Sequence, residues 1–248
     1  MEAYSIFEKV MSIKGKKIFV IGASSALEKV IVSSLLEDGA SVVIANNEPV
    51  EFSNTISDVF DIFDHAQIEE RIGRLIMQYG KFDGFLYCVT HSDFRPLSTV
   101  KHDNLVNIMN ENFFSFIDAL RTLVKKHGLN DGASVVAISS ISSIKAMKAK
   151  LAFCSAKAAL DAAVRCLAVE LASKKIRVNS IQKGIVYEDF SKENIQAITE
   201  INGGAEIDKL PLGITNGIEI ANTIKFLMSD QTKTLTGTSI VIDGGYTV

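Results

Sequence analysis

The sequence predicts an α/β fold in which helices cover both faces of a parallel β-sheet, a doubly wound arrangement. Short apolar runs alternate along the chain with longer stretches of helical period, which is typical of such sheets. Most of the short runs are unbroken sequences of Val, Ile, Leu and Phe, as expected when both faces of a strand are buried. The 248 residues contain no repeat or linker and only three prolines. We therefore expect residues 1–248 to form one domain.

The bounds of the individual strands and helices are predicted from where the apolar runs and the stretches of helical period begin and end. The candidate strands are, in order, Lys17–Ile21, Ser41–Ala45, Thr55–Phe60, Gly84–Val89, Ser134–Ser139, Arg177–Ile181 and Ser239–Asp243. The candidate helices between them are Ala26–Asp38, Ala66–Tyr79, Asn104–Lys126, Phe153–Ser173 and Gly217–Ser229. Two of these helices are followed by a glycine where a helix commonly ends, at Gly39 and Gly128.

One connection is too short for a complete crossover helix. Only about nine residues separate Asn46 from the strand near Ile56, fewer than the ~10–12 that a crossover with its helix needs. We therefore expect the second helix of the pattern to be reduced to a single turn.

Charge and cysteine content exclude several classes of function. The chain carries 26 basic and 29 acidic side chains, a formal net charge of −3, and lacks the clustered positive charge of a nucleic-acid-binding surface. No apolar run approaches the ~18 residues of a membrane span, and Met1–Ser5 does not resemble the start of a secretory signal. The three cysteines and four histidines lack metal-ligand spacing. We expect a cytoplasmic protein with reduced cysteines and no metal, nucleic-acid or membrane partner.

In open parallel sheets, ligands bind beyond the carboxyl ends of the strands, where the strand order reverses. The stretch Tyr187–Pro211 follows the last of these ends, is polar, and has no clear place in the sheet. It is either a mobile cover over the site or an ordinary surface excursion, and the sequence leaves both interpretations open. The predicted strand ends are Gly22–Ala26, Asn46, Asp61, Thr90–Asp93, Ser139–Ser143 and Gly184–Asp189.

Several segments, in the right order, resemble the short-chain dehydrogenase/reductase family, and the likeness covers nearly the whole chain. They are Lys14–Ser25, Arg177–Ile181 with Gly184, Leu210–Gly213, Glu219–Asn222, Phe226–Asp230, Leu235–Gly237 and Val241–Gly245. Within the family, the chain is most similar to the 3-oxoacyl-carrier-protein reductases. The resemblance implies a seven-stranded, Rossmann-like parallel sheet and NAD or NADP as cofactor. It also implies a small keto or hydroxyl substrate and a homo-oligomer, dimer or tetramer, built on Asn104–Lys126 and Phe153–Ser173.

The resemblance also places the catalytic residues of the family, and one of them is missing. The family uses a Tyr and, one helical turn later, a Lys whose charge lowers the pKa of the phenol. Lys157 matches the lysine, but Phe153 stands at the tyrosine position and has no proton to give. Ser140 matches the serine that polarises the carbonyl, and Asn112 matches the asparagine of the proton path. General acid–base catalysis contributes typically ~10²–10⁴-fold, so we expect turnover to be slow.

The phosphate turn departs from the family pattern as well. The family glycines match Gly22, Ala26 and Glu28, and only the first is a glycine here. Bare backbone at these positions lets a pyrophosphate approach the helix N-terminus. A carboxylate at Glu28 either occupies that N-terminus and repels phosphates, at ~1–4 kcal/mol per like-charge pair, or swings outward to solvent. The sequence leaves these two arrangements open.

Other cofactor positions do not reveal the choice between NAD and NADP. Asn46 stands where an acid selects NAD, and it offers neither a carboxylate nor a cation. Asp61 and Ile62, which touch the adenine in the family, are kept. The residues at the family's glycine, proline and threonine positions are Thr90, Lys183 and Glu188. The resemblance assigns cofactor-binding positions to Gly22, Ser24, Ser25, Leu27, Asn46, Asp61, Ile62, Val89, Lys157, Gly184 and Val186.

Two hypotheses of function follow from these positions. The first is a diverged relative that has lost ordinary NAD(P)-linked carbonyl reduction and serves as a binding or regulatory partner, because the changes converge on one site. The second is an active NAD(P)-dependent oxidoreductase acting on a keto or hydroxyl group. It would use Ser140 and Lys157 with a proton donor other than a tyrosine at the usual position. The candidate donors are Tyr87, Tyr187, Ser139, Ser142, Ser143, Lys145 and water.

A lysine-rich stretch precedes Phe153 and has two readings. Its lysines either attract an acidic substrate or a carrier protein's phosphopantetheine arm, or they form an ordinary solvated loop. The lysines are Lys145, Lys148 and Lys150.

Overall fold

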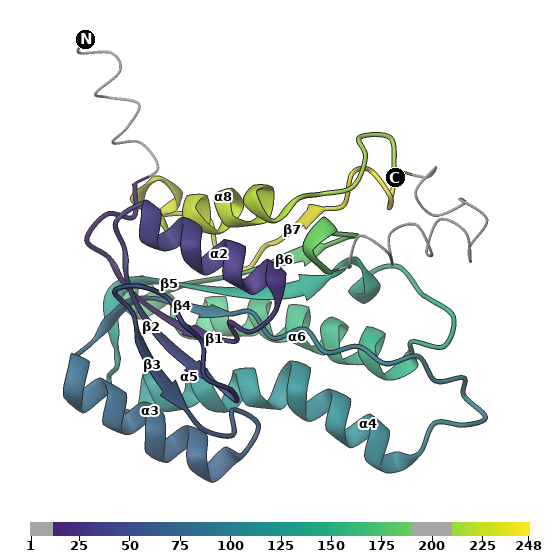
Figure 1. Cartoon of the computed structure of the whole chain (residues 1–248), viewed down its shortest axis with the longest axis horizontal. Coiled ribbons are helices and arrows are strands. Elements are labelled where there is room, and N and C mark those ends of the chain that lie inside the picture. The colour runs from purple at the N-terminus through teal and green to yellow at the C-terminus, as the bar shows by residue number, and fades with distance from the viewer. Residues whose placement is uncertain (1–11, 190–209) are drawn as a thin grey trace.

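The computed structural model describes residues 12–189 and 210–248, which build a seven-stranded parallel sheet (Figure 1). The strands lie in the order β3-β2-β1-β4-β5-β6-β7, and each neighbouring pair is parallel. This confirms the predicted sheet. The strands are β1 (Lys17–Ile21), β2 (Ser41–Asn46), β3 (Ile56–Val59), β4 (Phe82–Tyr87), β5 (Leu129–Ser140), β6 (Arg177–Lys183) and β7 (Ser239–Ile242).

Helices cover both faces of this sheet. Helices α2 and α8 pack together on one face, while α3, α5 and α6 cover the other (Figure 1). The doubly wound arrangement is therefore confirmed. The helices are α2 (Ala26–Glu37), α3 (His65–Tyr79), α4 (His102–Met109), α5 (Ser115–Lys125), α6 (Leu151–Glu170) and α8 (Gly217–Met228).

Each face of the sheet has its own apolar core because successive residues of a strand point to opposite faces. In β1, Phe19 belongs to the core under α3, α5 and α6, whereas Ile18 and Val20 belong to the core under α2 and α8. On the first face the ring of Phe85 stacks between Phe19 and Phe116, with centroid separations of 5.7 and 6.1 Å. Burial on both faces explains why this strand reads as one continuous apolar run.

The predicted helix Asn104–Lys126 has an irregular centre that its periodicity does not reveal. Between α4 and α5 the backbone forms a π-helical turn over Asn110–Phe114. Such a turn inserts backbone into the helix and is frequent at functional sites. It carries Asn112, one of the predicted site residues, whose side chain is completely buried.

Other boundaries differ from the sequence prediction at element ends. Strand β5 begins at Leu129, earlier than predicted, because Leu129 pairs with Phe82 of β4 before a register shift. Helix α6 begins at Leu151, ahead of Phe153. Residues 47–55, between β2 and β3, form only bends and turns, so even the single helical turn expected there is missing from this described stretch.

Membrane-spanning helices and metal sites were expected to be absent, and the structure bears on both only within the residues that it describes. None of the described helices is long and apolar enough to cross a membrane. Within the same residues no group of three or more His, Cys, Asp or Glu side chains is placed to hold a metal ion. Most of the stretch Tyr187–Pro211, which the sequence leaves open as a cover or a surface excursion, lies outside the described residues, at 190–209.

Candidate active site

The strand order reverses between β1 and β4, so the carboxyl ends of these strands define the expected binding crevice. Gly22 follows β1 and Val89 lies just beyond β4, and a Cβ built on Gly22 would lie 3.1 Å from a methyl of Val89. Ser140 ends β5 and Lys183 ends β6. The fold therefore brings the predicted phosphate turn and the predicted catalytic residues to one edge of the sheet.

A carboxylate of the chain itself occupies the phosphate turn. Ser25 caps helix α2 and its Oγ accepts the N–H of Glu28 at 3.2 Å. In return, Oε2 of Glu28 accepts the N–H of Ser25 at 2.8 Å, which completes a capping box. The other oxygen, Oε1, would lie 3.4 Å from a Cβ at Gly22. The side chain of Glu28 thus turns back under the loop, the first of the two arrangements considered from the sequence.

The electrostatics of Glu28 follow from this position. Burial raises the pKa of the carboxyl above its usual value, while hydrogen bonds from Ser25 and Ser24 and the ammonium of Lys183 oppose that shift. In this arrangement the N–H of Ser25 already serves a carboxylate at the helix N-terminus, where anions bind. With Glu28 in place, this N–H is not free to bind a phosphate oxygen.

Lys157 lies in the floor of the site and joins two strand ends. Its side chain is fully buried, and Nζ donates to the carbonyl oxygens of Val89 at 3.0 Å and Ile138 at 2.9 Å. The hydroxyl of Thr90 lies 3.5 Å from the same nitrogen. Burial, with a smaller contribution from the ammonium of Lys183, lowers the pKa of Lys157 to about 7.

This lowered pKa predicts a pH dependence of stability. The unfolded chain keeps the ammonium proton up to its ordinary pKa of 10.5, whereas folded Lys157 loses it above about 7. The unfolded state binds more protons in between, so the free energy of unfolding should rise by about 1–2 kcal/mol from pH ~7 to ~8.5. Urea unfolding at these pH values measures the rise, and Lys157→Met should remove it. An equal rise in Lys157→Met would assign it to other groups.

Phe153 and Ser140 occupy the positions of the family's acid and serine. The Phe153 ring is buried in a small apolar cluster with Ile108, Ala152 and Ala156, and its centroid lies 5.7 Å from Lys157 Nζ. Nothing on this ring can donate or accept a proton. Oγ of Ser140 accepts the N–H of Ser142 at 3.1 Å and is therefore used to cap the short turn that follows β5.

Asn112 ties the π-helical turn to the loop after β4. Its Oδ1 accepts the N–H of His91 at 3.1 Å, and its Nδ2 donates to the carbonyls of His91 at 2.8 Å and Ile108 at 3.0 Å. The amide is thus fully engaged with backbone. The imidazole of His91 in turn contacts Glu111 at 2.8 Å, a pair that the sequence analysis did not identify because its members are far apart in the chain.

Tyr87, considered as a substitute proton donor, has a structural role in the protein. Its hydroxyl is buried, donates to the carbonyl of Glu111 at 2.6 Å and lies 2.5 Å from Ser115 Oγ, and burial raises its pKa. We expect Tyr87→Phe to lower the free energy of unfolding by about 1–2 kcal/mol, because the Ser115 hydroxyl loses a partner inside the core. Urea unfolding checks this. A stable variant with altered ketone reduction would instead assign Tyr87 to catalysis.

The far end of the crevice carries a charged pair that the sequence analysis did not predict. Lys183, buried at the end of β6, forms an ion pair with Asp189 in the turn Tyr187–Asp189. Glu188, in the same turn, accepts the N–H of Gly217 at 2.8 Å at the start of α8. A lysine followed by two acids after a buried strand is the sequence signal that could have indicated such pairs. Tyr187 itself is 46% exposed.

The predicted adenine end is built from polar contacts between neighbouring loops. Asn46 is buried and bonds to Ser24, with Nδ2 donating to Ser24 Oγ at 2.9 Å. The N–H of Ile62 donates to Asn47 Oδ1 at 2.8 Å, and Asp61 is exposed. These residues lie at the ends of β2 and β3, on the same edge of the sheet as the phosphate turn.

Three further predicted cofactor positions have structural reasons of their own. Leu27 is buried in the core under α2 and α8. A Cβ at Gly184 would lie 2.7 Å from the Cβ of Asp243, so glycine is required by the close approach of the chain after β7. Val186 is fully buried and forms a bridge with Thr215. Their presence is therefore explained without a cofactor.

The lysine-rich stretch before α6 is more than a solvated loop. Nζ of Lys145 donates to the carbonyl of Tyr246 at 2.7 Å and lies 3.7 Å from the centroid of its ring. Nζ of Lys150 lies 4.4 Å from the ring centroid of Phe94 and 5.5 Å from that of Phe153. Two of the three lysines thus fix loops around the site.

Comparison with known proteins finds relatives of this chain that are named reductases. A family model described as enoyl-(acyl carrier protein) reductase matches residues 22–247. The chain is 29% identical to the L-xylulose reductase of Caenorhabditis elegans, over 93% of this chain and 95% of the relative. It is 25% identical to the D-erythrulose reductase of Gallus gallus, over 97% and 99%. Identity to the 3-oxoacyl-[acyl-carrier-protein] reductase of Thermotoga maritima is 23%, over 96% and 100%.

Solved structures agree with this placement. A short-chain dehydrogenase family protein from Francisella tularensis superposes with a TM-score of 0.82 at 26% identity, covering 94% of this chain and 99% of that one. The L-sorbose reductase of Gluconobacter frateurii, solved in complex with NADPH and L-sorbose, shares the fold with a TM-score of 0.83 at 18% identity, over 96% and 98%. The chain belongs to the short-chain dehydrogenase/reductase family and is similar to its 3-oxoacyl-carrier-protein reductases.

Proposed function

We propose that this chain is a short-chain dehydrogenase/reductase homologue in which ordinary NAD(P)-dependent carbonyl reduction is impaired or lost, and that it acts as a binding or regulatory member of the family. The arrangement of Glu28 carries the proposal. Its carboxylate accepts the N–H of Ser25 at 2.8 Å and lies beside Gly22, where a pyrophosphate would approach. Phe153 supports it independently, because this residue removes the general acid.

The opposite end of the crevice supports the same proposal. The ammonium of Lys183 is buried and paired with Asp189, and Glu188 is bonded to the start of α8. The three members kept from the catalytic set are also engaged: Lys157 with backbone carbonyls, Asn112 with His91 and Ile108, and Ser140 with Ser142. Polar groups that already have hydrogen-bond partners within the protein do not depend on a bound cofactor to satisfy them.

The second candidate function is an active NAD(P)-dependent oxidoreductase acting on a keto or hydroxyl group with a proton donor other than tyrosine. A specific observation favours it. The pKa of Lys157 is lowered to about 7, which is the range suited to general acid–base catalysis near neutral pH. The named relatives are reductases of sugars and of acyl-carrier substrates.

The remaining parts of the proposal concern ligands and assembly. We propose one domain, a cytoplasmic location, NAD or NADP as the cofactor of any residual binding, and a small keto or hydroxyl compound as the ligand. We also propose a homo-oligomer, dimer or tetramer, through the helices α5 and α6. Apolar side chains on or beside these helices remain exposed, namely Phe114 at 44%, Leu151 at 48% and Val169 at 78%.

Calorimetric titration of the full chain with NADH and with NADPH tests the proposal. We expect neither heat nor a thermal shift at a cofactor concentration of about 1 mM. Binding of either cofactor in the low micromolar range, together with reduction of a ketone, would overturn the proposal and favour the active oxidoreductase. Tight binding without turnover would place the impairment at Phe153 alone rather than at Glu28.

A further inference from the structure

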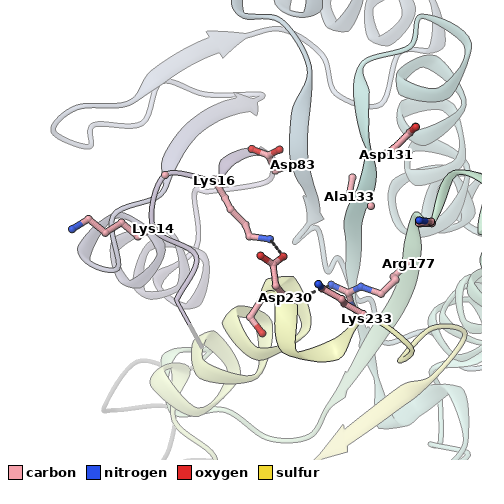
Figure 2. A pocket seen from close by; sticks show the side chains of 12 residues that line it. Lys14, Lys16, Asp83, Asp131, Ala133, Arg177, Asp230 and Lys233 are labelled. Carbon is pink, nitrogen blue, oxygen red and sulfur yellow. Dashed lines mark hydrogen bonds and ion pairs between the residues drawn. The ribbon is translucent and has the colours of Figure 1, made fainter. Parts of the chain in front are cut away.

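A cavity opens at the edge of the sheet opposite the candidate active site. It has a volume of about 650 Å³, in the range of small-molecule sites, and lies at the amino-terminal ends of β1, β4, β5 and β6. Figure 2 shows basic and acidic side chains from these strands and from the segment after α8 around it. Its charged lining residues are Lys14, Lys16, Asp83, Asp131, Lys175, Arg177, Asp230 and Lys233.

The acidic side chains of this cavity do not balance its five basic ones. Both oxygens of Asp83 are engaged, one by the N–H of Lys17 at 2.8 Å and the other by Asn130 Nδ2 at 2.7 Å. The exposed carboxylate of Asp131 points away from Arg177 (Figure 2). Asp230 is therefore the carboxylate on which the nearby cations converge.

Three positive charges act on Asp230. Nζ of Lys16 contacts its Oδ1 at 2.6 Å, and this contact lowers the pKa of Asp230 most, with further contributions from Lys233 and Arg177. Asp230 is itself 76% exposed at its side chain. Over the whole lining, five basic side chains face three acidic ones, so two positive charges remain uncompensated in a chain whose net charge is −3.

Arg177 is the fixed part of this positive charge. It is 6% exposed, and its guanidinium donates to the carbonyls of Ser229 at 3.2 Å and Leu235 at 3.4 Å. No carboxylate of the described residues forms an ion pair with it. A buried guanidinium without a direct ion pair is costly, and one held in place has further N–H groups suited to bidentate binding of an oxyanion.

We propose that this cavity binds a small phosphorylated molecule, with Arg177 and Lys233 binding its phosphate oxygens and Lys16 shared between the ligand and Asp230. Phosphate esters and pyrophosphates carry two or more negative charges, which matches the uncompensated cations better than a single carboxylate does. The glycines at 15 and 132 line the cavity with open space where a Cβ would stand, so the ligand meets bare backbone there. This site is independent of the phosphate turn at Glu28.

Titration of the full chain with inorganic pyrophosphate at low ionic strength tests the proposal. We expect saturable binding, weakened at least ~10-fold in a Lys175→Ala/Lys233→Ala variant, because both side chains are exposed and lie on the rim of the cavity. Lys174→Ala is the matched control, since Lys174 is also exposed but does not line the cavity. Equal binding by the double variant and the wild type would overturn the proposal.

A variant that is expected to bind pyrophosphate more tightly distinguishes a change in the ligand site from a loss of folded structure. Asp230→Asn removes the competing carboxylate and should tighten pyrophosphate binding by about 3- to 10-fold, whereas a damaged site would bind more weakly. Binding unaffected by Asp230→Asn would contradict the proposal. Titration with citrate tests whether the cavity prefers phosphates. If this tricarboxylate binds as tightly as pyrophosphate, the assignment to phosphates is wrong. These titrations keep Glu28 in place, because Glu28→Gly would free the N–H of Ser25 and open a second phosphate site at the turn.

Discussion

Glu28→Gly is expected to bind NADH or NADPH about 100-fold more tightly than the wild type, because it clears the phosphate turn of a carboxylate. In the wild-type protein, Glu28 accepts the N–H of Ser25 at 2.8 Å and stands beside Gly22. Glycine frees that N–H for a phosphate oxygen and removes a like charge from within a few ångströms of it. Titration calorimetry of both cofactors measures the change.

This experiment needs a control for stability, because Glu28→Gly removes the capping box together with the negative charge. We expect Glu28→Gly to cost about 1–2 kcal/mol of folding free energy. Glu219 provides a matched variant, because it forms the same box with Asn216 at the start of α8, with Oε2 2.9 Å from the Asn216 N–H. Glu219→Gly should lose similar stability and gain no affinity. Equal affinity of Glu28→Gly and wild type would show that Glu28 does not block the turn.

The fold was predictable because its signals are local and strong. Runs such as the one in β1 are apolar throughout, and burial of that strand on both faces is what the structure shows. The π-helical turn at Asn110–Phe114 escaped prediction because one extra backbone position leaves the helical period of the flanking segments almost unchanged. The start of β5 at Leu129 depends on pairing with Phe82, a contact that no local pattern encodes.

The location of the candidate site residues was predictable, but the contacts of their side chains were less so, and their role in catalysis stays a prediction. The resemblance brought Ser140, Lys157 and Asn112 to one edge of the sheet, and the structure places them there. The direction of Glu28 was open from sequence, because a side chain in the first turn of a helix can cap or face solvent at similar free energy. The pairing of Lys183 with Asp189 depends on how the backbone turns after β6.

The largest expected effect is on turnover, and it requires two substitutions. In a Glu28→Gly background, Phe153→Tyr should raise the rate of ketone reduction by about 10²–10⁴-fold, the usual contribution of a general acid. Phe153 lies one helical turn before Lys157, whose Nζ is 5.7 Å from the ring centroid, so a phenol there would feel the charge that favours its ionised form. L-xylulose and D-erythrulose, the sugars named for two relatives, are the first substrates to assay.

The two substitutions should act non-additively, and this distinguishes the proposal from a merely slow enzyme. Phe153→Tyr alone should gain little activity, because the phosphate turn still carries Glu28, and Glu28→Gly alone should bind cofactor without efficient proton transfer. Phe226→Tyr, at a half-buried phenylalanine on α8, is the control for adding a hydroxyl outside the site. Full activity from Phe153→Tyr alone would show that the cofactor seats despite Glu28. Activity in the wild type equal to that of the double variant would show that another group already supplies the proton, and the assignment of impaired chemistry would then be wrong.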